Sequence, residues 1–264
     1  MNTTSQTVVS PLPTYLQRGR LLPSVVHGGG GGRSTDQQRA EGTPIQLGDP
    51  GPCPAGGTTV FIVLDESASV AASDGNDPLS RRHVEAALAI RHLAAACHCR
   101  RDRVALLPFD RFSAGYVAPQ PLSAKGVIRL RRGLRHLSRG CGTSSELGPA
   151  LNDIEAKAGR EPGAVAVVVL SDFLLTDRNP AAVLSRLRSI GDSVHAVVLG
   201  AYPPAALLDD PNVTVTRLTP SSAPGAAARA VFSGLISFRT HSTTDQGSAA
   251  RHHQTDDEEG ELIT

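Results

Sequence analysis

Apolar runs alternate with amphipathic stretches through the middle of the chain. Val60–Leu64 and Ala164–Leu170 are unbroken apolar runs rich in β-branched residues, which is typical of strands buried on both faces of a parallel sheet. Further strands are predicted at Val104–Phe109, Val194–Leu199 and Val213–Leu218, with a short edge strand near Tyr116–Ala118. Strands that alternate with helices predict an α/β fold: a doubly wound, mostly parallel sheet with helices on both faces and one short antiparallel edge strand.

Helical periodicity fills the segments between these strands. The predicted helices run from Ser80 to about Ala96, from Ser123, over Leu147–Ala158, from Asn179-Pro180, and from about Ala223 to Phe238. A serine favours the position before a helix because its hydroxyl can accept an exposed backbone N–H, and proline favours the first helical position. Each of these helices has an apolar stripe at the spacing needed to pack on a sheet.

The two ends of the chain differ in composition from the middle. Residues 1–57 are rich in Pro, Gly, Ser and Thr and include the run Gly28–Gly32, so they are predicted to form a flexible arm. Residues 240–264 are polar and end in a run of acidic residues, which predicts a disordered tail. The domain itself is therefore expected over residues 58–239.

Charge and hydropathy exclude several classes of function. The net charge of +1 gives no general attraction to nucleic acid or membranes. One predicted helix has an arginine-rich outer face, which we interpret as a solvated face, with guidance of an acidic partner as the alternative. Its arginines are Arg129, Arg131, Arg132, Arg135 and Arg139. No aromatic residues interleave with them, so we expect no nucleic-acid surface.

We expect no membrane span, because no stretch approaches the ~20 apolar residues that a span requires. The N-terminus also lacks the positively charged start and apolar segment of a secretory signal. A cytoplasmic location is the expectation.

Oxygen-bearing side chains follow both of the fully apolar runs. Asp65 ends the first run, and Ser67 and Ser69 follow it at alternate positions. Asp172 closely follows the second run, and Thr143 precedes a predicted helix. The carboxyl ends of parallel strands meet at one edge of a sheet, so these side chains can converge there. Carboxylates held close together repel unless they are protonated or bridged by a cation, and hard cations prefer oxygen ligands. The alternative is that Asp65 caps a helix and the two serines satisfy a turn.

This arrangement resembles the metal-ion-dependent adhesion site of von Willebrand factor type A (vWA) domains over residues 58 to 239. The resemblance implies that Ser67, Ser69 and Thr143 touch the metal directly, while Asp65 and Asp172 act through water or orient the other ligands. The implied ion is Mg²⁺, with Mn²⁺ or Ca²⁺ as alternatives. The implied function is a non-enzymatic protein-interaction module, in which the ion captures an Asp or Glu side chain of a partner protein.

The segment Ser-Asp-Phe-Leu at Ser171–Leu174 resembles a bacterial branch of that family. Members of this branch often work beside AAA+ ATPases, so the resemblance makes such an ATPase a candidate partner. The chain departs from the family pattern in that Phe173 replaces the glycine that often follows the last aspartate, and in that Glu146 lies close to Thr143.

Two other functions remain open from the sequence. Haloacid-dehalogenase-like phosphatases also carry an Asp after a buried strand, but they have a second Asp two residues later, where this chain has Ser67. The other open function is that of a structural module that binds its partners through the N- and C-terminal arms and not through a metal ion.

The four cysteines, Cys53, Cys97, Cys99 and Cys141, do not form the pattern of a disulfide framework in a chain of 264 residues. Cys97-His98-Cys99 together with Cys141 offers ligands suited to zinc. We favour packing over zinc, because Cys97 falls on the buried stripe of its helix and the Cys-x-Cys spacing differs from the usual zinc spacing.

Overall fold

The structure is a computed structural model, and it describes residues 45–71, 75–77, 81–97, 99–109, 114–138, 142 and 144–249, with only the backbone for 240–249. The chain divides into two units, Met1–Asp49 and Pro50–Thr264. The strands and helices below all belong to the second unit. No helix in the described ranges combines the length and the apolar character needed to cross a membrane.

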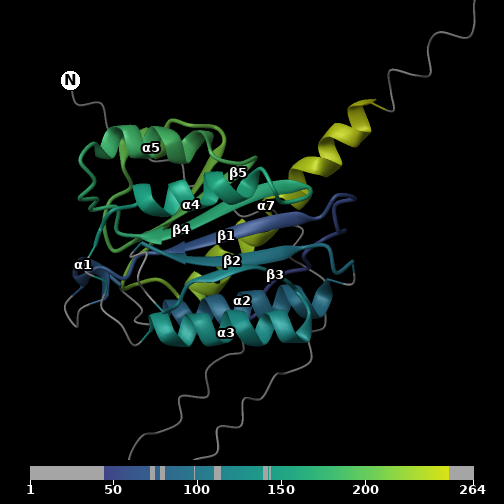
Figure 1. Ribbon diagram of the computed structural model, residues 1–264, viewed down its shortest axis with the longest axis horizontal. Helices are drawn as coiled ribbons and strands as arrows, with labels where there is room; N and C mark the ends of the chain where they lie inside the picture. Colours follow the sequence, from purple (N-terminus) through teal and green to yellow (C-terminus); the bar gives the residue numbers. More distant parts are fainter. Residues whose placement is uncertain are drawn as a thin grey trace, which may run out of the picture. The chain divides into compact units, whose positions relative to one another are not determined.

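Six strands form one sheet in the order β3-β2-β1-β4-β5-β6 (Figure 1). The strands are β1 Thr58–Leu64, β2 Arg103–Pro108, β3 Val117–Pro121, β4 Ala164–Ser171, β5 Ser193–Leu199 and β6 Val213–Leu218. β3 is antiparallel to its neighbour β2, and the other pairs are parallel. The predicted fold class is therefore confirmed, including the antiparallel edge strand.

Helices cover both faces of the sheet (Figure 1). They are α1 Ala68–Ala71, α2 Arg82–Ala96, α3 Ala124–Leu137, α4 Gly148–Ala158, α5 Pro180–Ser189, α6 Ala205–Leu208 and α7 Ala226–Ala249. α4 and α5 pack on one face, where their leucines meet the alternate residues Phe61 and Val63 of β1. α2, α3 and α7 lie on the other face (Figure 1). Because both faces are covered, every residue of β1 is buried, as the unbroken apolar run predicts.

Local capping signals position two of the helices as predicted. The Ser123 side chain accepts a hydrogen bond from the Gly126 N–H at 3.3 Å, and the Asn179 side chain accepts one from the Ala182 N–H at 3.1 Å. Ser80, the third predicted cap, lies outside the described residues, and α2 begins at Arg82.

The last helix departs from its predicted bounds. α7 begins at Ala226 and continues past Phe238 to Ala249. No proline follows Pro224 to stop the helix, and each added residue of an established helix gains a hydrogen bond. The beginning of α7 has a long-range cap, because the buried Glu85 carboxylate of α2 accepts the Gly225 and Ala228 N–H groups at 3.3 and 3.0 Å. A carboxylate at a helix N-terminus also interacts favourably with the helix dipole.

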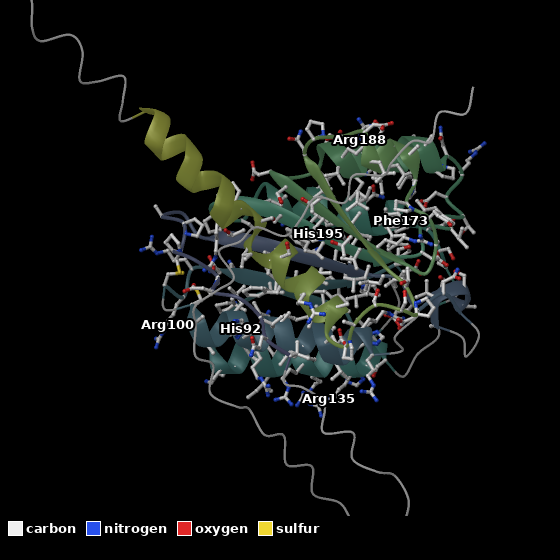
Figure 2. The ribbon with its side chains drawn as sticks, turned by 180° about the vertical axis from the view of Figure 1, so that it is seen from behind. His92, Arg100, Arg135, Phe173, Arg188 and His195 are labelled. Atoms are coloured by element: carbon white, nitrogen blue, oxygen red, sulfur yellow. The ribbon has the colours of Figure 1, made fainter. Side chains whose placement is uncertain are left out.

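His195 of β5 lies beneath α7 and is 1% exposed (Figure 2). Its Nε2 is 2.9 Å from the Thr216 hydroxyl, and its Nδ1 has no hydrogen-bond partner among the described residues. The helix approaches closely here because Gly234 has no side chain: a Cβ at that position would lie 3.2 Å from His195 Nδ1. Burial lowers the pKa of His195 from 6.5 to about 4, because the charged imidazolium loses its hydration.

We therefore expect the free energy of unfolding to depend on pH through His195. Between pH 6.5 and about pH 4 the imidazole of His195 is protonated in the unfolded chain but neutral in the folded chain. Acidification across this window therefore favours unfolding. The contribution is about 1.4 kcal/mol per pH unit. Urea unfolding between pH 7.5 and 4.5 should show a shallower pH dependence for His195→Leu than for the unmodified protein. Equal slopes for the two proteins would contradict this account of His195.

Candidate metal site at the carboxyl edge of the sheet

The pairing of β1 with β4 brings two aspartates to the same edge of the sheet. Leu64 pairs with Leu170, and the Asp65 N–H donates to the Leu170 carbonyl at 2.9 Å. Asp65 therefore follows β1 at the level where β4 ends, and Asp172 directly follows β4. The strand order reverses direction between β1 and β4, which is where open α/β sheets place their ligand crevices.

Asp65 is a carboxylate removed from water, with 0% of its surface exposed. One carboxylate oxygen accepts the Ser67 N–H at 2.9 Å, and the other accepts the Ser171 hydroxyl at 2.6 Å. Burial raises the pKa of Asp65, and the negative charge of Asp172 adds a smaller effect in the same direction, while the hydrogen bonds oppose both. A nearby cation would favour the ionised form of this carboxyl group.

Ser67 and Ser69 present their hydroxyls side by side, with 3.0 Å between the two Oγ atoms. Adjacent ligands of an octahedral Mg²⁺ with metal–oxygen bonds of 2.0–2.1 Å stand about 2.9 Å apart. Two neutral oxygens at this spacing, close to a buried carboxylate, fit two neighbouring positions around such an ion. In the absence of an ion, the same spacing is that of a hydrogen bond between the hydroxyls.

Asp172 is 1% exposed and is held from two sides. Its Oδ1 accepts the Leu174 N–H at 3.0 Å, and its Oδ2 accepts the Asn76 side-chain amide at 2.9 Å. The backbone N–H of Asn76 donates to the Ser69 carbonyl at 2.6 Å, which ties this residue to the first loop. Asn76 could not be predicted from the sequence, because nothing near it in the chain marks it as a partner of the distant Asp172.

Thr143, the fifth predicted ligand, lies outside the described residues. The preceding residue is described: the Gly142 N–H donates to the Glu66 carbonyl at 2.6 Å. The segment that precedes α4 therefore contacts the first loop, Asp65–Ser69, one residue before Thr143. The structure thus brings together Asp65, Ser67 and Ser69 with Asp172, while the position of the Thr143 side chain stays a prediction.

Phe173, which follows Asp172, has a backbone conformation that favours glycine. It has φ of +57°, the left-handed region that glycine adopts without strain. A non-glycine residue there costs about 1–2 kcal/mol. Phe173 is 7% exposed and packs in the core on the α4–α5 face, and burying such a ring stabilises by about 1.5–3 kcal/mol. The buried ring (Figure 2) thus offsets the strain of the turn.

A buried network of charged groups braces the first loop against α2. Arg82 donates to Glu66 at 3.0 Å and to the Asp65 carbonyl at 3.2 Å, and it also pairs with Asp77. His83 contributes a 2.7 Å contact between its Nε2 and the Glu66 carboxylate. Glu66 and Arg82 are 3% and 4% exposed. No local signal in the sequence marks this network, because its partners come from the Asp65–Ser69 loop and from α2.

No protein-family model and no curated protein matches this chain. Solved structures with some similarity include a von Willebrand factor type A protein from Catenulispora acidiphila, which is 13% identical with a TM-score of 0.48 over 69% of this chain and 42% of that one. The manganese-loaded TRAP protein of Plasmodium vivax is 13% identical with a TM-score of 0.44, over 68% of this chain and 73% of that one.

The N-terminal domains of the pili tip protein Mfa5 from Porphyromonas gingivalis are 18% identical with a TM-score of 0.35, over 46% of this chain and 20% of that one. This chain therefore spans less than half the length of the Mfa5 and Catenulispora proteins that it matches.

We expect Arg82→Met to lower the free energy of unfolding by about 3–5 kcal/mol, because it removes the cation that faces two buried carboxylates. The matched control is Arg188→Met, which removes an arginine whose side chain is 36% exposed from its pair with Asp210. The Asp210 side chain is 12% exposed, so this pair is far more accessible to water than the Arg82 pairs, and the control should lose about 1 kcal/mol or less. Urea unfolding at neutral pH measures both. A similar loss in the two variants would show that burial of the Arg82 network is not what stabilises the loop.

Proposed function

We propose that this chain is a metal-dependent protein-interaction module of the vWA type. In this proposal Asp65, Ser67, Ser69, Thr143 and Asp172 hold a Mg²⁺ ion at the carboxyl edge of the sheet. The observation that carries the proposal is the convergence of four of these residues beside the β1–β4 switch point, with the two serine hydroxyls 3.0 Å apart.

The donor set determines what the ion can do. Hydroxyl ligands are neutral, so they leave most of the positive charge of the ion uncompensated. Both carboxylate oxygens of Asp65 and of Asp172 accept hydrogen bonds that fix their orientation, and the vWA resemblance implies that these aspartates orient the site and hold metal-bound water. Mg²⁺ usually keeps several waters, and a carboxylate from another protein can replace one of them. The bound ion supplies an electrophilic position that attracts such a carboxylate.

The proposed partner is accordingly a protein that presents an Asp or Glu side chain. The resemblance to the bacterial branch makes an AAA+ ATPase one candidate for this partner. The arginine face of α3 offers a further attraction for an acidic protein: Arg129, Arg131, Arg132 and Arg135 are exposed, as Figure 2 shows for Arg135, while Arg139 lies outside the described residues.

The enzymatic alternative receives no support from the site chemistry. In a phosphatase of the haloacid-dehalogenase type, the residue two positions after the first aspartate is an acid that transfers a proton. Here that residue is Ser67, whose hydroxyl is directed to Ser69. We therefore propose binding without turnover. The alternative in which the arms bind partners rests on residues 1–57 and 240–264, most of which lie outside the described residues.

Magnesium should stabilise the folded protein through this site. At a Mg²⁺ concentration 100 times the dissociation constant, the stabilisation is about 2.7 kcal/mol, which raises the melting temperature by roughly 5 °C or more. Asp65→Asn keeps the shape of the buried side chain but removes its charge, so the shift should disappear. Asp209→Asn, at an exposed position after α6, is the control and should keep the full shift. Thermal melts with and without Mg²⁺ measure this, and a full shift in Asp65→Asn would refute the proposed site.

Partner capture should depend on the same residues. Proteins retained by the immobilised chain in Mg²⁺ should be released by a chelator, and they should not be retained by Ser67→Ala or Thr143→Ala. Ser185→Ala, at an exposed position of α5, should retain them. If capture survives both the chelator and the two site substitutions, the arms or the arginine face carry the interaction.

A further inference from the structure

Three cysteines and an aspartate gather at the opposite edge of the sheet from the candidate magnesium site. Cys53 precedes β1, Cys97 and Cys99 follow α2, and Asp102 immediately precedes β2. The amino ends of β1 and β2 lie at this edge, whereas Asp65 lies at the carboxyl end of β1. A strand of this length separates the two places by about 20 Å.

The four ligand atoms form a tight group around Cys97. Its Sγ lies 3.5 Å from Cys53 Sγ, 3.2 Å from Cys99 Sγ and 3.4 Å from Asp102 Oδ2. All four ligand atoms lie within 4.8 Å of one another. The three cysteines are free thiols, and the sulfur separations far exceed the 2.03–2.05 Å of a disulfide bond.

These separations are close to those of a tetrahedral metal site. With Zn–S bonds of about 2.3 Å and Zn–O bonds of 2.0–2.2 Å, the sulfurs of a zinc site stand about 3.8 Å apart, and sulfur and oxygen about 3.5 Å apart. Small adjustments of the cysteine side chains would therefore admit an ion. Three thiolates and one carboxylate complete four-coordination, which is the number that structural zinc sites use.

The surroundings hold the carboxylate and one sulfur in place. Asp102 Oδ1 accepts the Thr58 N–H at 3.1 Å, and Oδ2 is paired with the buried guanidinium of Arg239 from α7. The Arg101 N–H is directed at Cys99 Sγ at 3.5 Å, after a turn in which Arg100 has φ of +55°. Ligands of protein metal sites are commonly fixed by such outer hydrogen bonds. The positive charge of Arg239 also offsets part of the negative charge of three thiolates and a carboxylate.

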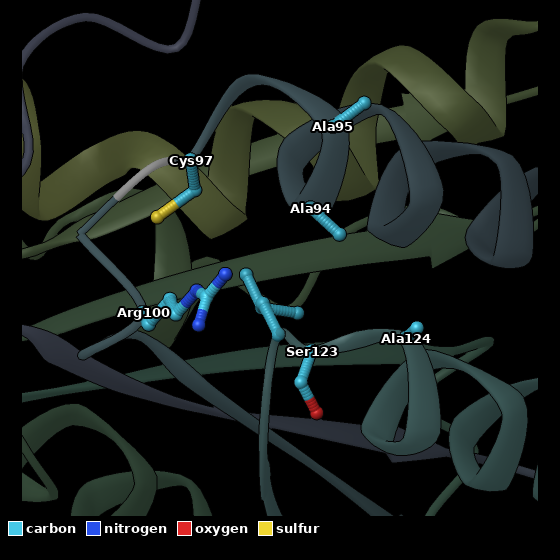
Figure 3. A pocket seen from close by; sticks show the side chains of 7 residues that line it. Ala94, Ala95, Cys97, Arg100, Ser123 and Ala124 are labelled. Atoms are coloured by element: carbon cyan, nitrogen blue, oxygen red, sulfur yellow. The ribbon is translucent and has the colours of Figure 1, made fainter.

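A route from solvent reaches the group. A pocket of about 430 Å³ opens beside Cys97 and is lined by the end of α2, by Arg100 and by the start of α3 (Figure 3). Cys97 itself lines this pocket beside the small side chains of Ala94 and Ala95, so a hydrated ion can approach the Cys97 thiol through it. An entry path is one of the features expected of a functional metal site.

We propose that Cys53, Cys97, Cys99 and Asp102 bind a zinc ion in a structural site that is independent of the magnesium site. On binding, the three thiols release their protons to water, and the ion links three separate parts of the chain. The linked parts are the segment before β1, the α2–β2 connection and, through Arg239, α7. Arg239 also donates to the Gly51 carbonyl at 3.0 Å, so it already holds the segment that carries Cys53.

Metal content tests the proposal. Protein purified under reducing conditions without chelator should contain one zinc ion per chain by elemental analysis. Cys53→Ser is the most informative variant, because Cys53 is half-buried and precedes β1, outside the strands and helices, so its loss should remove the zinc and leave the fold intact by circular dichroism. Cys141→Ser, at the one remaining cysteine of the chain, should keep the zinc. Asp65→Asn should also keep it, which separates this site from the proposed magnesium site.

A second measurement covers the case in which a cysteine variant fails to fold. The unmodified protein, stripped of metal and reduced, should take up one Co²⁺ with the ultraviolet charge-transfer absorption of thiolate ligands, and Zn²⁺ should displace it. Arg239→Gln should weaken zinc binding about 10–100-fold, the usual effect of losing an outer partner. The proposal is overturned if the stripped protein binds neither ion, if the cysteines instead form a disulfide with no metal retained, or if Asp65→Asn removes the zinc.

Discussion

The register between β1 and β4 is the constraint on which the candidate site depends. Each strand contains an unbroken apolar run, Val60–Leu64 in β1 and Ala164–Leu170 in β4, and both strands are buried, so a slip of one residue would turn core side chains to the wrong face of the sheet. Because Leu64 stands beside Leu170, the first polar residues after each strand emerge at one level. Two carboxyl groups are thereby held together away from water, which raises the pKa of Asp65. The buried apolar runs fix the positions at which Asp65 and Asp172 leave the sheet. The sheet therefore holds two carboxylates close enough to repel each other, and a bound divalent ion would compensate that repulsion.

The loops that carry the polar groups are held by buried charge and backbone contacts. Arg82 reaches from α2 to the Asp65 carbonyl and to the Glu66 carboxylate, so the first loop is anchored to a helix that packs on the sheet. Asn76 links the first loop to Asp172, and Ser171 links the end of β4 to Asp65. A site whose ligands are held by such contacts is largely formed before any ion arrives, which reduces the ordering that binding requires. The strained turn at Phe173 fits this picture, since its buried ring stabilises a conformation that an exposed loop would not keep.

Features that depend on interactions between residues close in the sequence could be predicted, and features that depend on contacts between distant segments could not. The apolar runs that form β1 and β4, and the helix caps at Ser123 and Asn179, depend on neighbours within a few residues, and they were predicted correctly. The placement of Asp65 and Asp172 at one edge followed from the general geometry of parallel sheets. Asn76, the Glu85 cap of α7 and the Arg82 network depend on contacts between distant segments, and no local pattern marks them. Cys53 was assigned to a flexible arm on composition, although its thiol lies 3.5 Å from that of Cys97.

β1 connects two chemically different edges of one sheet. At its amino end, Thr58 donates to Asp102 beside three thiols, and just beyond its carboxyl end Asp65 lies among hydroxyls. Sulfur ligands select soft or borderline ions, and oxygen ligands select hard ones, so the two edges would sort two metals by ligand chemistry alone. Among the described residues, side chains such as Arg239 and Asp102 connect the segments at the thiol edge, and the oxygen edge lies on loops already fixed from both sides. An ion at the first edge would therefore act chiefly on the stability of the fold. An ion at the second would add stability only through its own binding free energy, and it would act chiefly on what the protein can bind.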